Sequence, residues 1–305
     1  MNFDRVRRSF LAVLIFLNLA ATSVLAAPQV AVSVRPLALV VREICKDVCV
    51  VVEMIPPGAS EHHWEPSPKD VVRSAGSILG VGIGTSFVKK LMKTMLPNLP
   101  GKQKTPQIFL SNSISLMKIG VNELSGGHHG HGHGHDHGEL DPHVWFDPYR
   151  MKQVVPMITE ALVGVLPTQE KTLRANAVAT ELMLSELDKE ISKVSSGWRK
   201  AKVLVLHDAT GYFSDRYKVD IKAFSSGGTG HEFSPRDLAK LNKKLNGPVA
   251  GVVVEKIDGL GRNLAKELKS PIVEVDFSGS KASDYRQWMM NFVKILDGLF
   301  SSAKK

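Results

Sequence analysis

Three histidines and one aspartate, widely separated along the chain, stand in loops or directly after apolar runs. They are His62, His143, His207 and Asp276. In α/β folds the loops that follow parallel strands meet at one edge of the sheet, where ligands bind. Three imidazoles and a carboxylate can hold a four-coordinate metal such as zinc. The residues alone leave a second interpretation open, because a lone histidine after a strand is more often a hydrogen-bonded structural group.

Residues 1–26 have the pattern of a cleavable secretory signal peptide. A segment with three arginines precedes an apolar stretch from Phe10 to Leu19, and Val24-Leu25-Ala26 supplies compact residues for cleavage after Ala26. A buried N-terminal helix is the alternative. No later apolar run reaches the length of a membrane span. The mature chain is therefore expected in the periplasm or an equivalent exported space.

The charge of the chain is positive but dispersed. Removal of the signal peptide takes away three arginines and Asp4, which changes the formal net charge from +9 to +7 (9 − 3 + 1). The remaining lysines are scattered along helical stretches. A nucleic-acid-binding protein needs a focused basic patch with interleaved aromatic residues, and the sequence contains none. A solvated lysine surface is expected, with no nucleic-acid partner.

Cys45 and Cys49 are the only cysteines. In an oxidising compartment, two cysteines four residues apart can form a disulfide if a turn separates them, and the sequence between them reads as a helix end turning into a strand. Half of a metal site is the alternative, but there is no second cysteine pair to complete it. The disulfide is favoured.

Strand-like apolar runs alternate with helical segments in two separate regions. The expected strands cover residues 29–34, 48–55, 77–84, 108–110, 202–206, 221–224, 249–254 and 272–275. The run 48–55 is almost wholly apolar, which is typical of a strand covered on both faces. Ser67 and Pro68 predict the start of a helix. This alternation indicates the α/β class, with mostly parallel sheets.

A long helical stretch separates the two regions. Pro156 and Pro167 are expected to break its first part, and apolar residues recur every three to four positions over residues 169–194. A helix of this length spans nearly 40 Å, about the size of a lobe. The expected organisation is a first lobe over 27–147, connecting helices over 148–197 and a second lobe over 198–305.

Residues 126–138 interrupt the first lobe with the low-complexity sequence GGHHGHGHGHDHG. They cannot form a packed core and are expected to be a loop. The six histidines of this loop are His128, His129, His131, His133, His135 and His137. Closely spaced imidazoles can bind additional zinc weakly and raise its local concentration. The alternative is a tolerated insertion without effect on transport.

Three blocks carry a resemblance to a known family. They read GxxxHxxEPSPxD at Gly58–Asp70, DPHxWxDP at Asp141–Pro148 and HDAxxYF at His207–Phe213. In this order they resemble the signature of the cluster A-I metal-binding proteins of ABC importers, and the resemblance extends from about residue 29 to the end. It implies two α/β lobes joined by a long rigid helix, a membrane permease as partner, a monomeric state and no enzymatic activity.

The resemblance also implies ligands. His62, His143 and His207 match the three histidine ligands of the family, and Asp276 falls where manganese-binding members place a carboxylate. Glu61 replaces the proline that is common before the first histidine ligand. A Glu-His pair at this position resembles the zinc-uptake (ZnuA-like) branch, in which the glutamate can approach the metal. The segment after Asp276 departs from the family pattern, so Glu61, Asp276 or water remain alternatives for the fourth ligand.

The resemblance favours Zn²⁺ as the transported ion. Three neutral imidazoles suit zinc, whereas manganese prefers more oxygen ligands, and a histidine-rich loop is typical of the zinc branch. A manganese-binding member of the family is the first alternative. A secreted zinc hydrolase is the second, but no HExxH motif is present. A surface adhesin is the third, although no cysteine follows the predicted cleavage site to carry a lipid.

Overall fold

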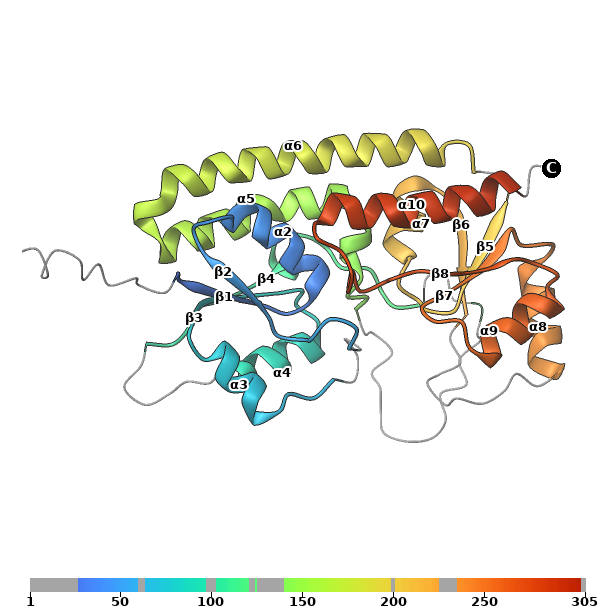
Figure 1. The fold of residues 1–305 in the computed structure, drawn as a ribbon, viewed down its shortest axis with the longest axis horizontal. Coiled ribbons are helices and arrows are strands. Elements are labelled where there is room, and N and C mark those ends of the chain that lie inside the picture. The colour runs from blue at the N-terminus through green and yellow to red at the C-terminus, as the bar shows by residue number, and fades with distance from the viewer. Residues whose placement is uncertain are drawn as a thin grey trace, which may run out of the picture.

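The computed structural model describes most of the chain after the predicted signal peptide. The described residues are 27–59, 64–96, 103–120, 124, 140–198, 201–224 and 235–302. The expected signal peptide, Glu61, His62 and the histidine-rich segment 126–138 lie outside them. The structure confirms the α/β class, with two lobes side by side beneath one long helix (Figure 1).

Each lobe is built on a four-stranded parallel sheet. The first has the order β2-β1-β3-β4 and the second β6-β5-β7-β8. The strands of the first sheet are β1 (Gln29–Val32), β2 (Val50–Glu53), β3 (Ser77–Gly82) and β4 (Gln107–Phe109). Those of the second are β5 (Lys202–Val205), β6 (Asp220–Ala223), β7 (Gly251–Val254) and β8 (Ile272–Glu274). In both sheets the strand order reverses next to the first strand, so the loops after the strands open a crevice there.

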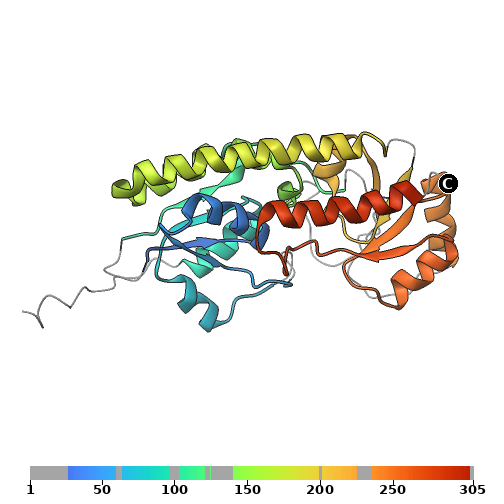
Figure 2. The same cartoon turned by 45° about the horizontal axis from the view of Figure 1, so that its top comes forward.

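Helices cover the sheets and join the lobes. They are α2 (Arg35–Cys45), α3 (Pro68–Ser74), α4 (Ser86–Met95), α5 (Pro148–Val165), α6 (Glu170–Ser195), α7 (Gly211–Tyr217), α8 (Pro235–Leu245), α9 (Gly259–Glu267) and α10 (Tyr285–Ser302). Helix α6 packs on α2 and α5 of the first lobe and on α7 and α10. Figure 2 shows α6 and α10 running side by side, with α10 starting where the lobes meet. The expected long connecting helix is therefore confirmed.

Two details differ from the sequence-based expectations. The run 48–55 contains an edge strand, β2, and not a strand covered on both faces, because Val50 is 51% exposed. Pro156 does not break a helix, since α5 continues through it. Pro156 lies on the exposed side of α5, where water can satisfy the carbonyl that loses its backbone partner.

One large apolar core extends through both lobes, and two smaller apolar clusters lie in the second lobe. It includes Val30 and Val81 of the first sheet and Val203 and Val205 of the second. Aromatic side chains connect the two halves, with the ring of Phe146 5.0 Å from that of Phe292 and 6.1 Å from that of Phe277. Because rigid aromatic rings bury large areas, this continuous core favours one fixed arrangement of the lobes.

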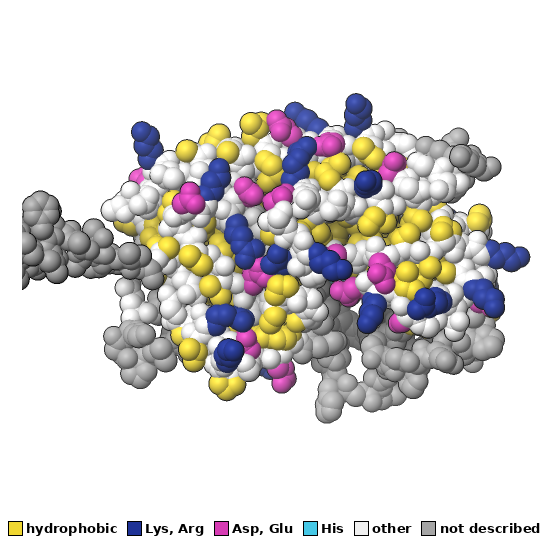
Figure 3. Space-filling model, in the orientation of Figure 1, with side chains coloured by type: hydrophobic (Ala, Val, Ile, Leu, Met, Phe, Trp, Pro, Cys, Tyr) yellow, Lys and Arg dark blue, Asp and Glu magenta, His cyan; other side chains and the backbone are white. Residues whose placement is uncertain are grey.

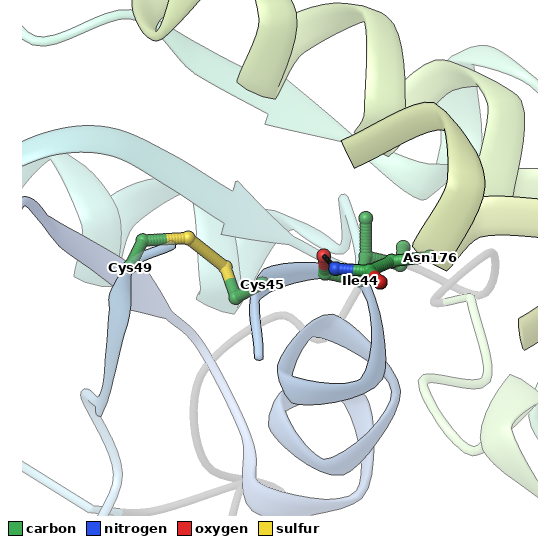
Figure 4. The surroundings of a disulfide bond; sticks show 4 residues. All are labelled: Ile44, Cys45, Cys49 and Asn176. Atoms are coloured by element: carbon green, nitrogen blue, oxygen red, sulfur yellow. Dashed lines mark hydrogen bonds between the residues drawn. A yellow bond between two sulfur atoms is a disulfide. The ribbon is translucent and has the colours of Figure 1, made fainter. Parts of the chain in front are cut away.

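The predicted disulfide is present at the end of α2. Cys45 and Cys49 are joined with their Cα atoms 5.2 Å apart, and both side chains are buried. Figure 4 shows the bond beside Ile44, whose carbonyl accepts a hydrogen bond of 3.1 Å from the Asn176 side chain of α6. The disulfide thus closes the turn between α2 and β2 next to the connecting helix.

Two further observations concern the charge of the surface and the length and apolar character of the helices. Lys and Arg side chains are spread over the face drawn in Figure 3 and are interspersed with acidic ones. In the part of the chain that the structure describes, no helix has both the length and the apolar character that crossing a membrane requires.

Candidate metal site

His143 and His207 approach each other where the two lobes meet. Their ring centroids are 5.2 Å apart and the rings are nearly perpendicular, at 87°. His143 lies in the segment that leads from the first sheet into α5, and His207 lies two residues after the end of β5. The two rings thus come from opposite sides of the joint between the lobes.

The orientation of His143 is fixed by Asp141. The Asp141 Oδ1 atom lies 2.6 Å from His143 Nδ1 and also accepts a hydrogen bond of 2.9 Å from the His143 backbone N–H. Both side chains are buried. Such a carboxylate partner on one ring nitrogen sets the tautomer and raises the basicity of the other nitrogen. Nε2 is therefore the atom of His143 suited to bind a metal.

Hydrogen bonds tie the second and third sequence blocks together. The Tyr212 hydroxyl of α7 donates to the Asp141 carbonyl over 2.9 Å and accepts from the Met117 backbone N–H over 2.8 Å. Arg150 of α5 pairs with Asp147, the N-cap of the same helix, and with Asp215 of α7. Burial raises the pKa of Asp147, against the opposing effect of Arg150. These contacts hold the His143 segment against the second lobe.

Phe277, in the turn after β8, packs against His207 with 5.2 Å between the ring centroids. The neighbouring Asp276 carboxylate accepts hydrogen bonds from the backbone N–H groups of Ser280 and Lys281, each 2.9 Å, and from the Ser278 hydroxyl at 3.1 Å. Burial alone would raise the pKa of Asp276, but these hydrogen bonds outweigh it and lower the pKa below its ordinary value. Asp276 is thus ionised and organises its own turn.

The first sequence block is described only at its flanks. Ala59 and Trp64, on either side of residues 60–63, both pack against the main core. Gly58 and Ala59 also line a cavity of about 20 Å³ together with Trp145 and Ser278. Further along the block, Ser67 caps α3 and exchanges hydrogen bonds with Asp70. The described flanks of the block therefore lie against the main core and at the start of α3.

Two of the expected ligands, Glu61 and His62, cannot be placed because they lie outside the described residues. Among the residues that are described, no group of three or more His, Cys, Asp or Glu side chains is arranged to hold a metal ion. The structure thus brings together His143 and His207, with Asp276 one residue from the Phe277 ring that touches His207. The auxiliary histidines of segment 126–138 also lie outside the described residues.

Sequence reasoning missed the groups that support His143. Asp141 was recognised as part of the DPH block but not as the hydrogen-bond partner of the ring, although an acidic residue two positions before a candidate ligand is a usable signal. Tyr212 belongs to the HDAxxYF block, but the sequence does not reveal its contact with Asp141, because the two residues are 71 positions apart.

Replacement of Asp141 by asparagine is expected to weaken metal binding by about 10- to 100-fold, the usual cost of losing a carboxylate behind a ligating histidine. Asn retains the size and one oxygen of the side chain but not its negative charge. Titration of chelator-treated protein with zinc measures the effect. Asp220→Asn is a control, because Asp220 is a carboxylate of the second lobe that pairs with Lys222 and lies outside this network. Equal affinities of the Asp141 variant and the wild type would contradict this role.

Comparison with solved structures identifies the fold of the protein. The structure is similar to a crystal structure of ZnuA, with a TM-score of 0.73, 19% identity and coverage of 90% of this chain and 99% of that chain. It is also similar to Zn(II)-bound AdcA from Streptococcus pneumoniae, with a TM-score of 0.70, 22% identity and coverage of 90% of this chain and 58% of that chain. The fold is thus that of the ZnuA-like solute-binding proteins.

The sequence comparisons identify the family. Residues 30–298 match the family described as zinc-uptake complex component A, periplasmic (ZnuA). The chain belongs to this family. It is 29% identical over 203 residues to the high-affinity zinc uptake system protein ZnuA of Yersinia pestis, covering 63% of this chain and 64% of that protein. It is 24% identical over 276 residues to the zinc-binding lipoprotein AdcA of Streptococcus pneumoniae, covering 87% of this chain and 52% of that protein.

Proposed function

We propose that this protein captures one zinc ion between its two lobes and delivers it to the permease of an ABC-type importer. The observation that carries the proposal is the approach of the His143 and His207 rings to 5.2 Å at the joint of the lobes. Both residues lie in family blocks, and relatives of the chain are named for zinc binding and zinc uptake. Zinc is the cargo here, and no catalytic step is involved.

The ion binds His62 and His143 from the first lobe and His207 from the second. His62 stands in the sequence between Ala59 and Trp64, and both of these flanking residues pack on the main core. Glu61, Asp276 or water supplies the fourth ligand. The three donors already bonded to the Asp276 carboxylate favour Glu61 or water, although a carboxylate can accept further bonds.

The donor set favours zinc over manganese. Neutral imidazoles bind zinc well, whereas manganese prefers carboxylate, carbonyl and water oxygens. The test uses untagged protein, treated with chelator and titrated with each metal in competition with an indicator. One zinc per chain with clear preference over manganese supports the proposal. Tighter binding of manganese would assign the protein to the manganese branch, and the absence of tight binding of either metal would refute capture.

The location follows from the same function. A periplasmic protein exported by a signal peptide over residues 1–26, acting as a monomer, can collect zinc and dock on a membrane permease. Export is tested by fractionation of cells and N-terminal sequencing of the mature protein, which should begin at Ala27. Recovery of the uncleaved chain from the cytosol would contradict this location.

Deletion of residues 126–138 is expected to leave the tight site intact and to remove additional, weaker zinc binding, because this segment supplies closely spaced imidazoles outside the three sequence blocks. Calorimetry of full-length and deleted protein measures the stoichiometry, and growth in zinc-depleted medium measures uptake. A matched variant with the six histidines replaced by serine separates the imidazoles from the length of the loop. Unchanged stoichiometry and unchanged uptake under scarcity would rule out the auxiliary role.

A further inference from the structure

Arg35, the first residue of α2, connects the two lobes beside the candidate metal site. Its Nε atom donates to the carbonyl of Gly279 and its Nη2 atom donates to the carbonyl of Ala282, both over 2.7 Å. These carbonyls belong to the segment that runs from β8 to α10, 244 and 247 residues away in the sequence. Arg35 therefore binds a turn that the second sheet leads into, while it is itself anchored in the first lobe.

The guanidinium is held in place from the first-lobe side. Its Nη1 atom forms an ion pair of 2.8 Å with Glu53 at the end of β2, and Glu53 is paired as well with Arg42 of α2. The Arg35 side chain is 20% exposed and that of Glu53 is 9% exposed. A planar guanidinium with three fixed partners is a directional connection, unlike apolar packing.

The turn that Arg35 binds is internally rigid. The Asp276 carboxylate accepts the hydrogen bonds from Ser280 and Lys281, and the Asp276 carbonyl accepts one of 2.7 Å from the indole N–H of Trp288 in α10. Gly279 has a φ of +66°, a left-handed conformation that suits glycine. The position of Gly279 and Ala282 therefore determines the position of the whole turn, defined here as residues 276–282.

The turn carries a ring that contacts a candidate ligand. Phe277 is 2% exposed and packs against His207, whose ring faces His143. Arg35 also lines the cavity of about 20 Å³ that Trp145, Ala59 and Ser278 border. The connection from Glu53 through Arg35 and the turn to Phe277 thus ends at the imidazole that the second lobe contributes.

We propose that Arg35 is a positioning residue for the metal site, which fixes the turn at residues 276–282 against the first lobe and so sets the placement of His207 opposite His143. This inference rests on the proposed function. Neither carbonyl of the turn nor Arg35 contacts the metal. Loss of the connection lets the lobes sample a wider range of separations, so fewer molecules present the two imidazoles at binding distance, and the apparent affinity falls by that fraction.

The first measurement compares zinc affinities of Arg35→Gln, Arg35→Lys and Arg42→Gln. Arg42 shares the Glu53 partner with Arg35, and none of its described hydrogen bonds reaches the turn, which makes it the matched control. Arg35→Gln is expected to weaken zinc binding about 10-fold, within the usual range of coupling between sites, at unchanged stoichiometry. Arg42→Gln should change it less than twofold. Arg35→Lys keeps the charge beside Glu53 but lacks the planar fork that bonds both carbonyls, so its affinity should also fall.

The second measurement does not depend on zinc. Spin labels at Val72→Cys and Lys256→Cys, exposed positions of the first and second lobes, report the distance between the lobes in chelator-treated protein. The two native cysteines form a disulfide, so only the introduced ones react. Arg35→Gln and Arg35→Lys should broaden the distance distribution and Arg42→Gln should not. Arg35→Lys serves alone if Arg35→Gln does not fold.

The outcomes separate the two proposals. Wild-type affinity and a wild-type distance distribution in Arg35→Lys would overturn the positioning role. A positive charge beside Glu53 would then be enough to hold the lobes, without the planar fork that bonds both carbonyls. Equal effects of Arg42→Gln and Arg35→Gln would overturn it as well. Failure of the wild type to bind zinc would refute the proposed function, whereas the distance measurement would still decide whether Arg35 fixes the lobes.

Discussion

Replacement of His143 or His207 by alanine is expected to weaken zinc binding on the order of 100-fold in each case. Zinc held by four protein ligands is bound with about 10–16 kcal/mol in total, so one ligand contributes about 3 kcal/mol. The His143 and His207 rings already approach each other across the joint, so each replacement removes one of the two imidazoles that the structure brings together. Competition titration with a fluorescent zinc chelator measures the effect, and His62→Ala is expected to behave in the same way.

A histidine outside the three blocks provides the control. His231 lies in no family block, and His231→Ala should bind zinc as the wild type does. The variant with all three block histidines replaced should lose tight binding altogether. If a single replacement at position 143 or 207 left the affinity within threefold of the wild-type value, that histidine would not be a ligand.

Addition of zinc is expected to raise the unfolding temperature of the chelator-treated protein by roughly 7 °C. At a free zinc concentration 1,000 times Kd, binding to the folded state contributes about 4.1 kcal/mol, and with an unfolding entropy of about 2.1 cal/mol/K per residue a unit of about 280 residues shifts its Tm by about 1.7 °C for each kcal/mol. One cooperative transition is expected, because the largest apolar core runs through both lobes. Differential scanning calorimetry with and without zinc measures the shift.

Acidification should diminish this zinc-dependent shift. Histidine must be neutral to bind a metal and ordinarily takes up a proton near pH 6.5, so zinc competes with protons below that value. The shift should therefore be full at pH 8 and much smaller at pH 5. Protein with His62, His143 and His207 all replaced is the control and should show no shift at either pH. A shift that is independent of pH, or that persists in this variant, would place the stabilising zinc elsewhere.

The fold could be predicted from the sequence because its signals are local. Apolar runs and Pro or Ser at helix starts indicated the strands and helices, and the spacing of Cys45 and Cys49 indicated their disulfide. The two errors concern properties that are not local. The run 48–55 is apolar enough for a buried strand, yet β2 lies at the edge of its sheet, and sequence periodicity does not report strand order. The sequence does not show which side of a helix faces the solvent, and therefore it did not indicate that α5 could continue through Pro156.

The site could be predicted in part. His143 and His207 were found because they stand in recognisable blocks, and the fold brings them together. The contacts that hold them were not found, since Tyr212 reaches Asp141 across 71 residues and Arg35 reaches Gly279 across 244. Such contacts depend on how the lobes are packed, and one sequence carries no local pattern for them. The role of Asp276 in its own turn depends on the backbone conformation of that turn, which the sequence does not reveal.

The central claim is that zinc is held between the lobes by His62, His143 and His207. A crystal structure of the zinc-loaded protein, with anomalous diffraction collected at the zinc absorption edge, tests it most directly. The account predicts one strong anomalous peak at the joint, with an imidazole nitrogen of each histidine at about 2.0–2.1 Å. A structure in which the bound zinc lies away from His143 and His207 would contradict it.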